Sequence, residues 1–127
     1  KGLLPAGKTS VTLKELSKTP LIFRELGSKT REKLVQEAAK QKITLRPAIE
    51  AEGREAVREV VASGAGIGFV SKAEFVIDER LVPLKIAGLE ISMSESLVHL
   101  SQRRDVKVIR SFMDCARSLQ SEKPRQV

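Results

Sequence analysis

A glycine and two hydroxyl residues stand where an apolar stretch gives way to a charged, helix-like one, in Gly27-Ser28-Lys29-Thr30. Ser28 or Thr30 could accept a hydrogen bond from a free N–H group at a helix start, which stabilises the helix by about 1 kcal/mol. The same N–H groups and hydroxyls could hold a carboxylate, sulfate or phosphonate, with Lys29 and Arg31 adding positive charge. Spacing alone favours the cap, because every such helix needs a cap and few bind anions.

Groups suited to acid–base or metal chemistry are sparse. Glu50 and Glu52 form a candidate pair of carboxylates, but at the rim of a loop their acid–base partnership is weak. His99, the single histidine, lies in a strand-like run and is interpreted as a partly buried structural residue. Cys115 is interpreted as a small core residue of the last helix. No spacing is typical of metal ligands, so we expect no catalytic residue, no metal and no cofactor.

Apolar periodicity divides the chain into alternating strands and helices. Short apolar runs predict strands at 21–23, 48–51 and 67–70, and apolar stripes predict helices at 30–41, 54–63 and 105–119. Weaker patterns predict a short helix at 72–77, strands at 81–86 and 95–100, and a frayed tail at 120–127.

The glycines of the stretch 64–69 resemble a dinucleotide fingerprint in an unsuitable context. That fingerprint follows a strand and opens a helix, whereas here a helix precedes the glycines and a strand follows. We therefore expect Gly64 to end a helix, Gly66 to form a tight turn and Gly68 to allow close packing.

The alternation of strands and helices predicts an α/β fold with a largely parallel sheet and helices on both faces, in three αβα layers. In such sheets, ligands gather where strands end and helix N-termini present free N–H groups. Three places meet that description, at residues 27–30, 50–53 and 69–72.

The composition is that of an ordinary globular chain. Its 127 residues, 41% hydrophobic and 31% charged, suit one domain, and the pattern of a membrane span or signal peptide is lacking, so we expect a cytoplasmic protein. The net charge of +7 raises the question of nucleic acid, but Lys and Arg alternate with Glu and Asp, and Trp and Tyr are lacking. Any DNA-reading part is expected outside this chain.

Taken in order, these pieces resemble the effector-binding domain of LysR-type transcriptional regulators over about residues 3–119. The resemblance rests on VTLKEL (11–16), PLIFRE (20–25), GSKTR (27–31), EAEGREAV (50–57) and VVASGAGIGFV (60–70). The last stretch is the most specific, because the family runs a helix through a glycine turn into a strand at this point.

The resemblance implies a two-lobed fold similar to type II periplasmic binding proteins, with an effector in the cleft between the lobes. Residues 13–70 match the second lobe, 71–119 match the strands and helix that return to the first lobe, and 120–127 form the tail. The winged helix-turn-helix and the first half of the first lobe, which come earlier in the family, have no counterpart here. We expect a partial domain, in which oligomerisation or strand exchange covers the incomplete lobe.

The resemblance also implies site residues. Two loops on one rim of the cleft would bind the effector, with Ser28 and Thr30 as hydroxyl donors and 51–53 as backbone contacts. A cleft-facing Glu50 or Glu52 would favour an effector with an amino group as well as an acid. The effector-binding set is Gly27, Ser28, Lys29, Thr30, Glu50, Ala51, Glu52 and Gly53, and a dimer interface would include Ile109, Phe112 and Met113.

We therefore expect a ligand-sensing regulatory module that binds a small anionic or zwitterionic effector and transmits the event through a dimer rearrangement. DNA would be a partner only through a winged helix-turn-helix absent from this chain, and no membrane partner is expected. The alternatives are a bilobal enzyme or solute-binding protein of the same fold, or a structural fragment without a competent site.

Overall fold

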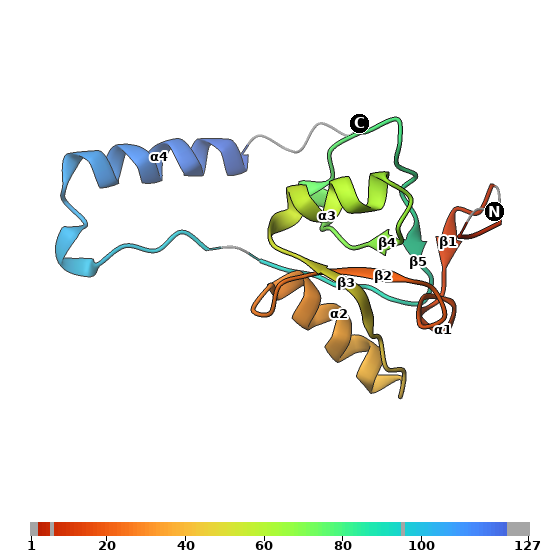
Figure 1. The fold of residues 1–127 in the computed structure, drawn as a ribbon. Helices are drawn as coiled ribbons and strands as arrows, with labels where there is room; N and C mark the ends of the chain where they lie inside the picture. The colour runs from red at the N-terminus through yellow and green to blue at the C-terminus, as the bar shows by residue number, and fades with distance from the viewer. Residues whose placement is uncertain (1–2, 6, 95, 122–127) are drawn as a thin grey trace. The chain divides into compact units, whose positions relative to one another are not determined.

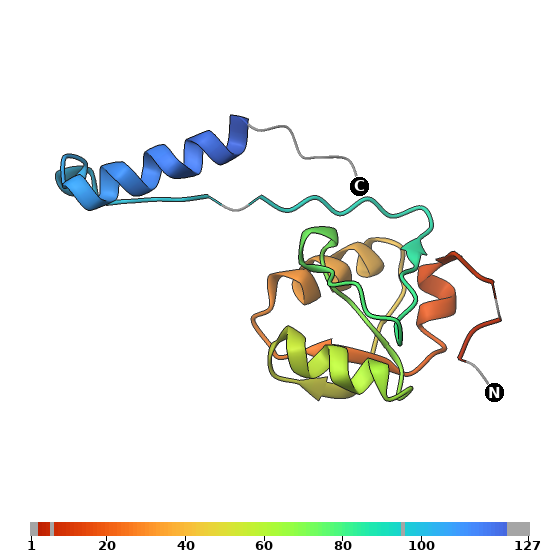
Figure 2. The same cartoon turned by 90° about the horizontal axis from the view of Figure 1, so that it is seen from above.

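The computed structural model describes residues 3–5, 7–94 and 96–121, which belong to two compact units, 1–91 and 92–127 (Figures 1 and 2). The first unit contains β1 (Ser10–Val11), α1 (Leu13–Leu16), β2 (Leu21–Arg24), α2 (Lys29–Lys40), β3 (Pro47–Ala51), α3 (Gly53–Ala62), β4 (Ile67–Gly68), a 3-10 turn (Lys72–Glu74) and β5 (Lys85–Ile86). The second unit contains a 3-10 turn (Ser101–Arg103) and α4 (Lys107–Ser121).

The main sheet has the strand order β3-β2-β4, with both pairings parallel. The register is irregular between Leu21 and Ile22, so that Leu21 lies beside Pro47 and Ile22 beside Ile49. Proline fits at this first position of β3, because its missing N–H interrupts little of the ladder there. β1 and β5 form a separate parallel pair.

Helices cover both faces of the main sheet, with α2 on one side and α3 on the other (Figure 1). Successive side chains of a strand point to opposite faces. Leu21 and Phe23 pack with Leu34 and Ala38 of α2 in the main core, and each is at most 2% exposed. Ile22 is fully buried on the other side of β2. The predicted α/β fold with αβα layers is confirmed.

A capping box begins α1 and directs two leucines into the same core. The Glu15 N–H donates to Thr12 Oγ1 at 3.2 Å, and the Thr12 N–H donates to Glu15 Oε2 at 2.9 Å. This short helix therefore starts at a fixed residue, and Leu13 and Leu16 are buried in the core.

Gly64 and Gly68 have the roles predicted for them, whereas the turn lies at Ser63 and Gly64 rather than at Gly66, which instead packs closely against Pro20 and Ile22. Gly64 follows Ser63, the C-cap residue of α3, with φ at +86°, a conformation that glycine adopts without strain. A Cβ on Gly66 would lie 2.5 Å from the carbonyl oxygen of Pro20, and one on Gly68 would lie 2.8 Å from Val61. Both positions need glycine because β4 and α3 pack so closely onto β2.

The predicted helices at 30–41 and 54–63 and the strands at 21–23 and 48–51 are confirmed within about a residue of their ends. Other predicted elements were too long. The strand predicted at 67–70 has only two residues, the strand predicted at 81–86 is limited to Lys85–Ile86, and the helix predicted at 72–77 is a 3-10 turn. α4 begins at Lys107 and continues to Ser121, through the first two residues of the expected tail. Residues 122–127 lie outside the described residues.

The strand predicted at 95–100 is wrong for residues 96–100, and Glu95 lies outside the described residues. Apolar residues such as Val98, 86% exposed, gave this segment a strand-like pattern. A strand needs a neighbour for its backbone groups, and residues 96–100 belong to no sheet.

Candidate functional site

Parallel pairing brings the ends of three strands to one edge of the sheet. Arg24 lies beside Ala51, and Ile22 beside Gly68, in parallel registers. The segments after β2, β3 and β4 therefore leave the sheet at the same edge, where α2 and α3 begin.

α2 begins with its own cap and leaves other groups open. Gly27, with φ at +94°, turns the chain, and the buried Ser28 accepts a hydrogen bond from the Arg31 N–H at 3.5 Å. Within the described part of the chain, the N–H groups of Lys29 and Thr30 and the Thr30 hydroxyl have no hydrogen-bond partner. The cap and the anion-binding interpretation are therefore compatible, because Ser28 uses only one of the free N–H groups.

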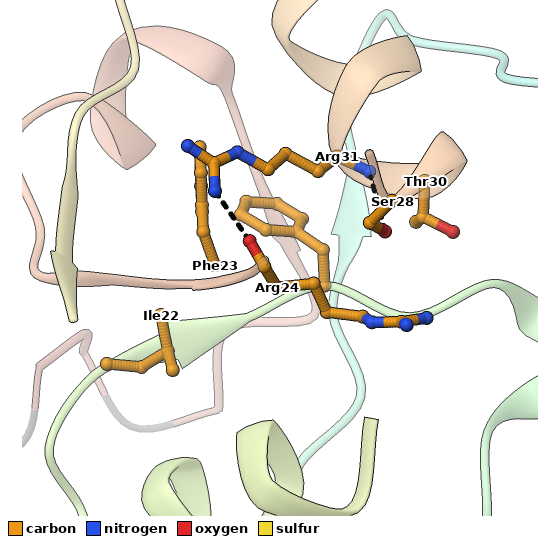
Figure 3. A pocket seen from close by; sticks show the side chains of 7 residues that line it. Ile22, Phe23, Arg24, Ser28, Thr30 and Arg31 are labelled. Atoms are coloured by element: carbon orange, nitrogen blue, oxygen red, sulfur yellow. Dashed lines mark hydrogen bonds between the residues drawn. The ribbon is translucent and has the colours of Figure 1, made fainter. Parts of the chain in front are cut away.

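Arg31 ties α2 to the ends of β2 and β3. Its Nη1 donates to the carbonyl oxygen of Arg24 at 2.6 Å (Figure 3), and its Nη2 donates to Glu50 Oε1 at 2.9 Å. The guanidinium also lies 5.3 Å from the centroid of the Phe23 ring, and the side chain is only 13% exposed. Arg31 is thus held in place by these contacts and its charge is paired with Glu50, so it is not a free cation for a ligand.

A hollow of about 10 Å³ lies at the start of α2 (Figure 3). Phe69, which follows β4, closes it with an edge-to-face contact of 5.7 Å between its ring centroid and that of Phe23. The hollow has room for about one water molecule, so it is too small to enclose an effector by itself. Its lining residues are Ile22, Phe23, Arg24, Ser28, Thr30, Arg31 and Phe69.

α3 receives its cap from a residue 28 positions earlier in the chain. Glu52 stands at the N-cap position but makes no cap hydrogen bond with its side chain, and the Gly53 N–H instead donates to Glu25 Oε2 at 2.9 Å. Arg24 holds the Glu25 carboxylate with two of its nitrogens, the Nε at 3.3 Å from Oε2. Arg24 first, and the Gly53 N–H second, lower the pKa of Glu25 to about 2.

The segment after β4 is also occupied by internal contacts. Ser71 Oγ donates to Glu74 Oε2 at 2.8 Å, and Arg54 Nη1 donates to Glu74 Oε1 at 2.9 Å. The Ser71 hydrogen bond and the nearby Arg54 lower the pKa of Glu74. Arg54 also pairs with Glu55, so the start of α3 is surrounded by carboxylates.

The second unit presents an open apolar groove of about 510 Å³. Ile109, Phe112 and Met113 all line it, and Phe112 is 61% exposed. The structure therefore brings the three residues expected at a dimer interface together on one surface. The other lining residues are Leu97, Val98, His99, Leu100, Arg103 and Val108.

The sequence interpretations of His99 and Cys115 are wrong. Both side chains are exposed, and His99 Nδ1 lies 3.0 Å from the carbonyl oxygen of its neighbour Leu100. Burial needs a second layer, but the described residues of this unit form only α4, one 3-10 turn and unpaired segments.

The described residues contain neither a metal-ligand cluster nor a membrane-spanning helix. They contain no cluster of three or more His, Cys, Asp and Glu residues that could hold a metal ion. None of the helices in residues 3–5, 7–94 and 96–121 is long and apolar enough to cross a membrane.

A family model, described as the LysR substrate binding domain, matches residues 3–121. The chain belongs to this family. LysR substrate-binding domains are effector-binding regulatory modules of transcription regulators rather than enzymes, and oligomerisation is general among them. The search of curated proteins gave no match.

In this LysR substrate-binding domain, the predicted site residues lie at one edge of the sheet, but some are open to a ligand and others are already bound to neighbouring residues. Ser28 and Thr30 line the hollow, Glu50 is paired with Arg31, and Gly53 is bound to Glu25. The remaining predicted residues lie outside the lining of the hollow: Gly27 before α2, Lys29 at its first position, Ala51 at the end of β3, and Glu52 between β3 and α3.

Sequence reasoning missed Glu25 in this LysR substrate-binding domain. Its signal was an acidic residue directly after a strand, at the edge where a second helix begins. That signal becomes useful only once the parallel pairing of β2 with β3 is known, because Glu25 and Gly53 are distant in sequence.

Proposed function

We propose that this domain senses a small acidic or zwitterionic effector whose acidic group binds at the start of α2. The observation that carries the proposal is the set of unpartnered donors there among the described residues, namely the N–H groups of Lys29 and Thr30 and the Thr30 hydroxyl. Free N–H groups at a helix start favour an anion through hydrogen bonds and through the helix dipole.

The loop after β3 supplies the second part of the proposed site. Glu50 is paired with Arg31, so Glu52, which is exposed, is the carboxylate left to attract an amino group of the effector. Ala51 and Gly53 would add backbone contacts. Glu52→Gln should therefore weaken amino-bearing acids more than plain acids.

Effector binding in this proposal acts through lobes and dimers. Residues 13–70 would form the second lobe and 71–119 the return to the first. An effector that contacts both lobes would then increase the population of the conformation in which the lobes are closed. The groove of Ile109, Phe112 and Met113 would pair two copies, and a winged helix-turn-helix would carry the response to DNA. The expected effect is a change in dimer arrangement without turnover of the effector.

The test is a thermal-unfolding scan of this chain against amino acids, aromatic acids, other small acids and phosphonates. An effector present at about 100 times its Kd should stabilise the domain by roughly 2.7 kcal/mol, a shift of several degrees. Thr30→Ala removes the hydroxyl donor and should reduce a selective shift, whereas Thr44→Ala, at an exposed site away from this edge, should retain it in full. Equal shifts in both variants would contradict the proposed site.

Self-association has a separate test by sedimentation. Phe112→Lys places a charge in the groove and should weaken association by at least about tenfold. Leu119→Lys is the matched control, because Leu119 is similarly exposed, at 66%, on the same helix but outside the groove lining. Equal loss in both variants would contradict the assigned interface.

A further inference from the structure

Glu25 is a built-in anion at one of the two helix starts that face the candidate site. Its carboxylate lies between the Gly53 N–H, at 2.9 Å, and the Arg24 guanidinium, with the Nε at 3.3 Å. An arriving acid would need the same two partners. It could reach the start of α3 only by displacing a carboxylate already held by both of them.

The charges around this helix start also oppose a second anion. Glu55 lies in the first turn of α3, and Glu74 accepts a hydrogen bond from Arg54. Glu52, at the N-cap position, is exposed and makes no cap hydrogen bond. The arginines at this helix start are both paired with carboxylates, Arg24 with Glu25 and Arg54 with Glu55 and Glu74.

The backbone at Gly53 reinforces this arrangement. Gly53 has φ at +79°, a conformation that L side chains rarely adopt, and this turn aims its N–H at Glu25. The contact therefore fixes the distance between the ends of β2 and β3 as well as filling the helix start. Glu25 acts on a ligand by occupying a position, not by touching the ligand.

We propose that Glu25 is the specificity-determining residue that restricts this edge to one acidic group and selects monoacids over diacids. The inference rests on the proposed function, because it takes the start of α2 as the place where that single acid binds. At the start of α3, the ligand meets carboxylates, so its other end is neutral or carries an amino group. A diacid brings two like charges to an edge with one open anion position.

The test is a titration of the whole chain with butyrate and with succinate, a four-carbon monoacid and diacid, followed by the backbone amide resonances. In the wild type, both acids should move the Lys29 and Thr30 amides, neither should move Gly53 or Arg54, and butyrate should bind more tightly. In Glu25→Ala, succinate should also move Gly53 and should bind roughly threefold to fivefold more tightly than in the wild type. Glu25→Gln, which keeps an acceptor oxygen and the fold, should give an intermediate response.

Glu55→Ala is the matched control, since it removes a nearby carboxylate that pairs with Arg54 and leaves the Gly53 contact intact. It should leave the Gly53 resonance unmoved and should change the succinate affinity much less than Glu25→Ala does, and a response like that of Glu25→Ala would overturn the assignment. Movement of Gly53 in the wild type, or its silence in both Glu25 variants, would also overturn it. A third outcome separates the two proposals. If the Lys29 and Thr30 amide resonances do not move, and the Gly53 resonance moves only in the Glu25 variants, the role of Glu25 is upheld and the proposed function is contradicted.

Discussion

The starts of α2 and α3 lie at the same edge of one sheet, and each has a glycine at positive φ, Gly27 two residues before α2 and Gly53 as the first residue of α3. α2 is capped locally by Ser28 and keeps two N–H groups and a hydroxyl open in the described structure. In α3, the side chain of the N-cap residue Glu52 makes no cap hydrogen bond, and the Gly53 N–H instead donates to Glu25, which follows β2. Two similar helix starts can therefore differ in function, because one ligand position is filled by the protein itself.

The largest expected difference concerns the arginines of the two first turns. Arg31→Ala should lower the free energy of unfolding by about 2–3 kcal/mol, since it removes the packing on Phe23 and leaves the Arg24 carbonyl without its donor. Arg54→Ala should cause much less loss, because that side chain is 53% exposed and its ion pairs are screened by solvent. Urea unfolding measures both, and equal losses would contradict the assigned roles.

The two glycines sharpen the same comparison. Gly53→Ala should cost about 2 kcal/mol, because a side chain strains its φ of +79° and displaces the N–H from Glu25. Gly27→Ala should cost about 1 kcal/mol from strain alone, since nothing lies within 4 Å of its added Cβ. If thermal or urea unfolding showed a larger loss of stability for Gly27→Ala than for Gly53→Ala, the contact of Gly53 with Glu25 would not stabilise the domain as predicted.

The two N-cap residues should differ by a smaller amount. Ser28→Ala should destabilise the domain by about 1 kcal/mol, because the Arg31 N–H loses its acceptor. Glu52→Ala should change the free energy of unfolding by less than about 0.5 kcal/mol, since its side chain caps nothing. A comparable loss for Glu52→Ala would show that α3 uses its own cap.

The smallest expected difference between the two helix starts is in how stability changes at acidic pH. The pKa of Glu25 falls from 4.5 to about 2 on folding, so its ionised form favours the folded state above pH 4.5. That contribution is lost as the pH falls from 4.5 towards 2. Glu25→Gln should flatten the fall in stability over this range, whereas Ser28→Ala should lower stability without changing its slope. Chemical unfolding at several pH values would show whether the slopes differ.

The sequence was sufficient to predict the elements that carry their own signals. Leu34 and Ala38 at helical spacing predicted α2, and Leu21 to Phe23 after a proline predicted β2, because a buried face imposes a regular period. The three strand ends also followed from the parallel arrangement. Ser28 as the cap was one of two named possibilities.

The sequence was insufficient where a contact depends on distant pairing. Glu25 reaches Gly53 and Arg31 reaches Glu50 only because β2 lies beside β3, and no local pattern encodes that proximity. The predictions of a strand and of buried residues in the second unit were wrong for a different reason. Apolar residues such as Val98 suggested burial, although no layer of that unit covers them. An apolar period indicates a face but not what covers it.

The most direct test of the account is calorimetric titration of the chain with the acid selected by the thermal scan and with its neutral carboxamide. The account predicts that the acid binds roughly tenfold more tightly than the amide, because charge-assisted hydrogen bonds form only with the carboxylate. Thr30→Ala, which removes one of the three donors, should reduce this difference, and Glu52→Ala should not. Equal affinity of acid and amide, or a difference that Thr30→Ala leaves unchanged, would contradict an open anion position at the start of α2.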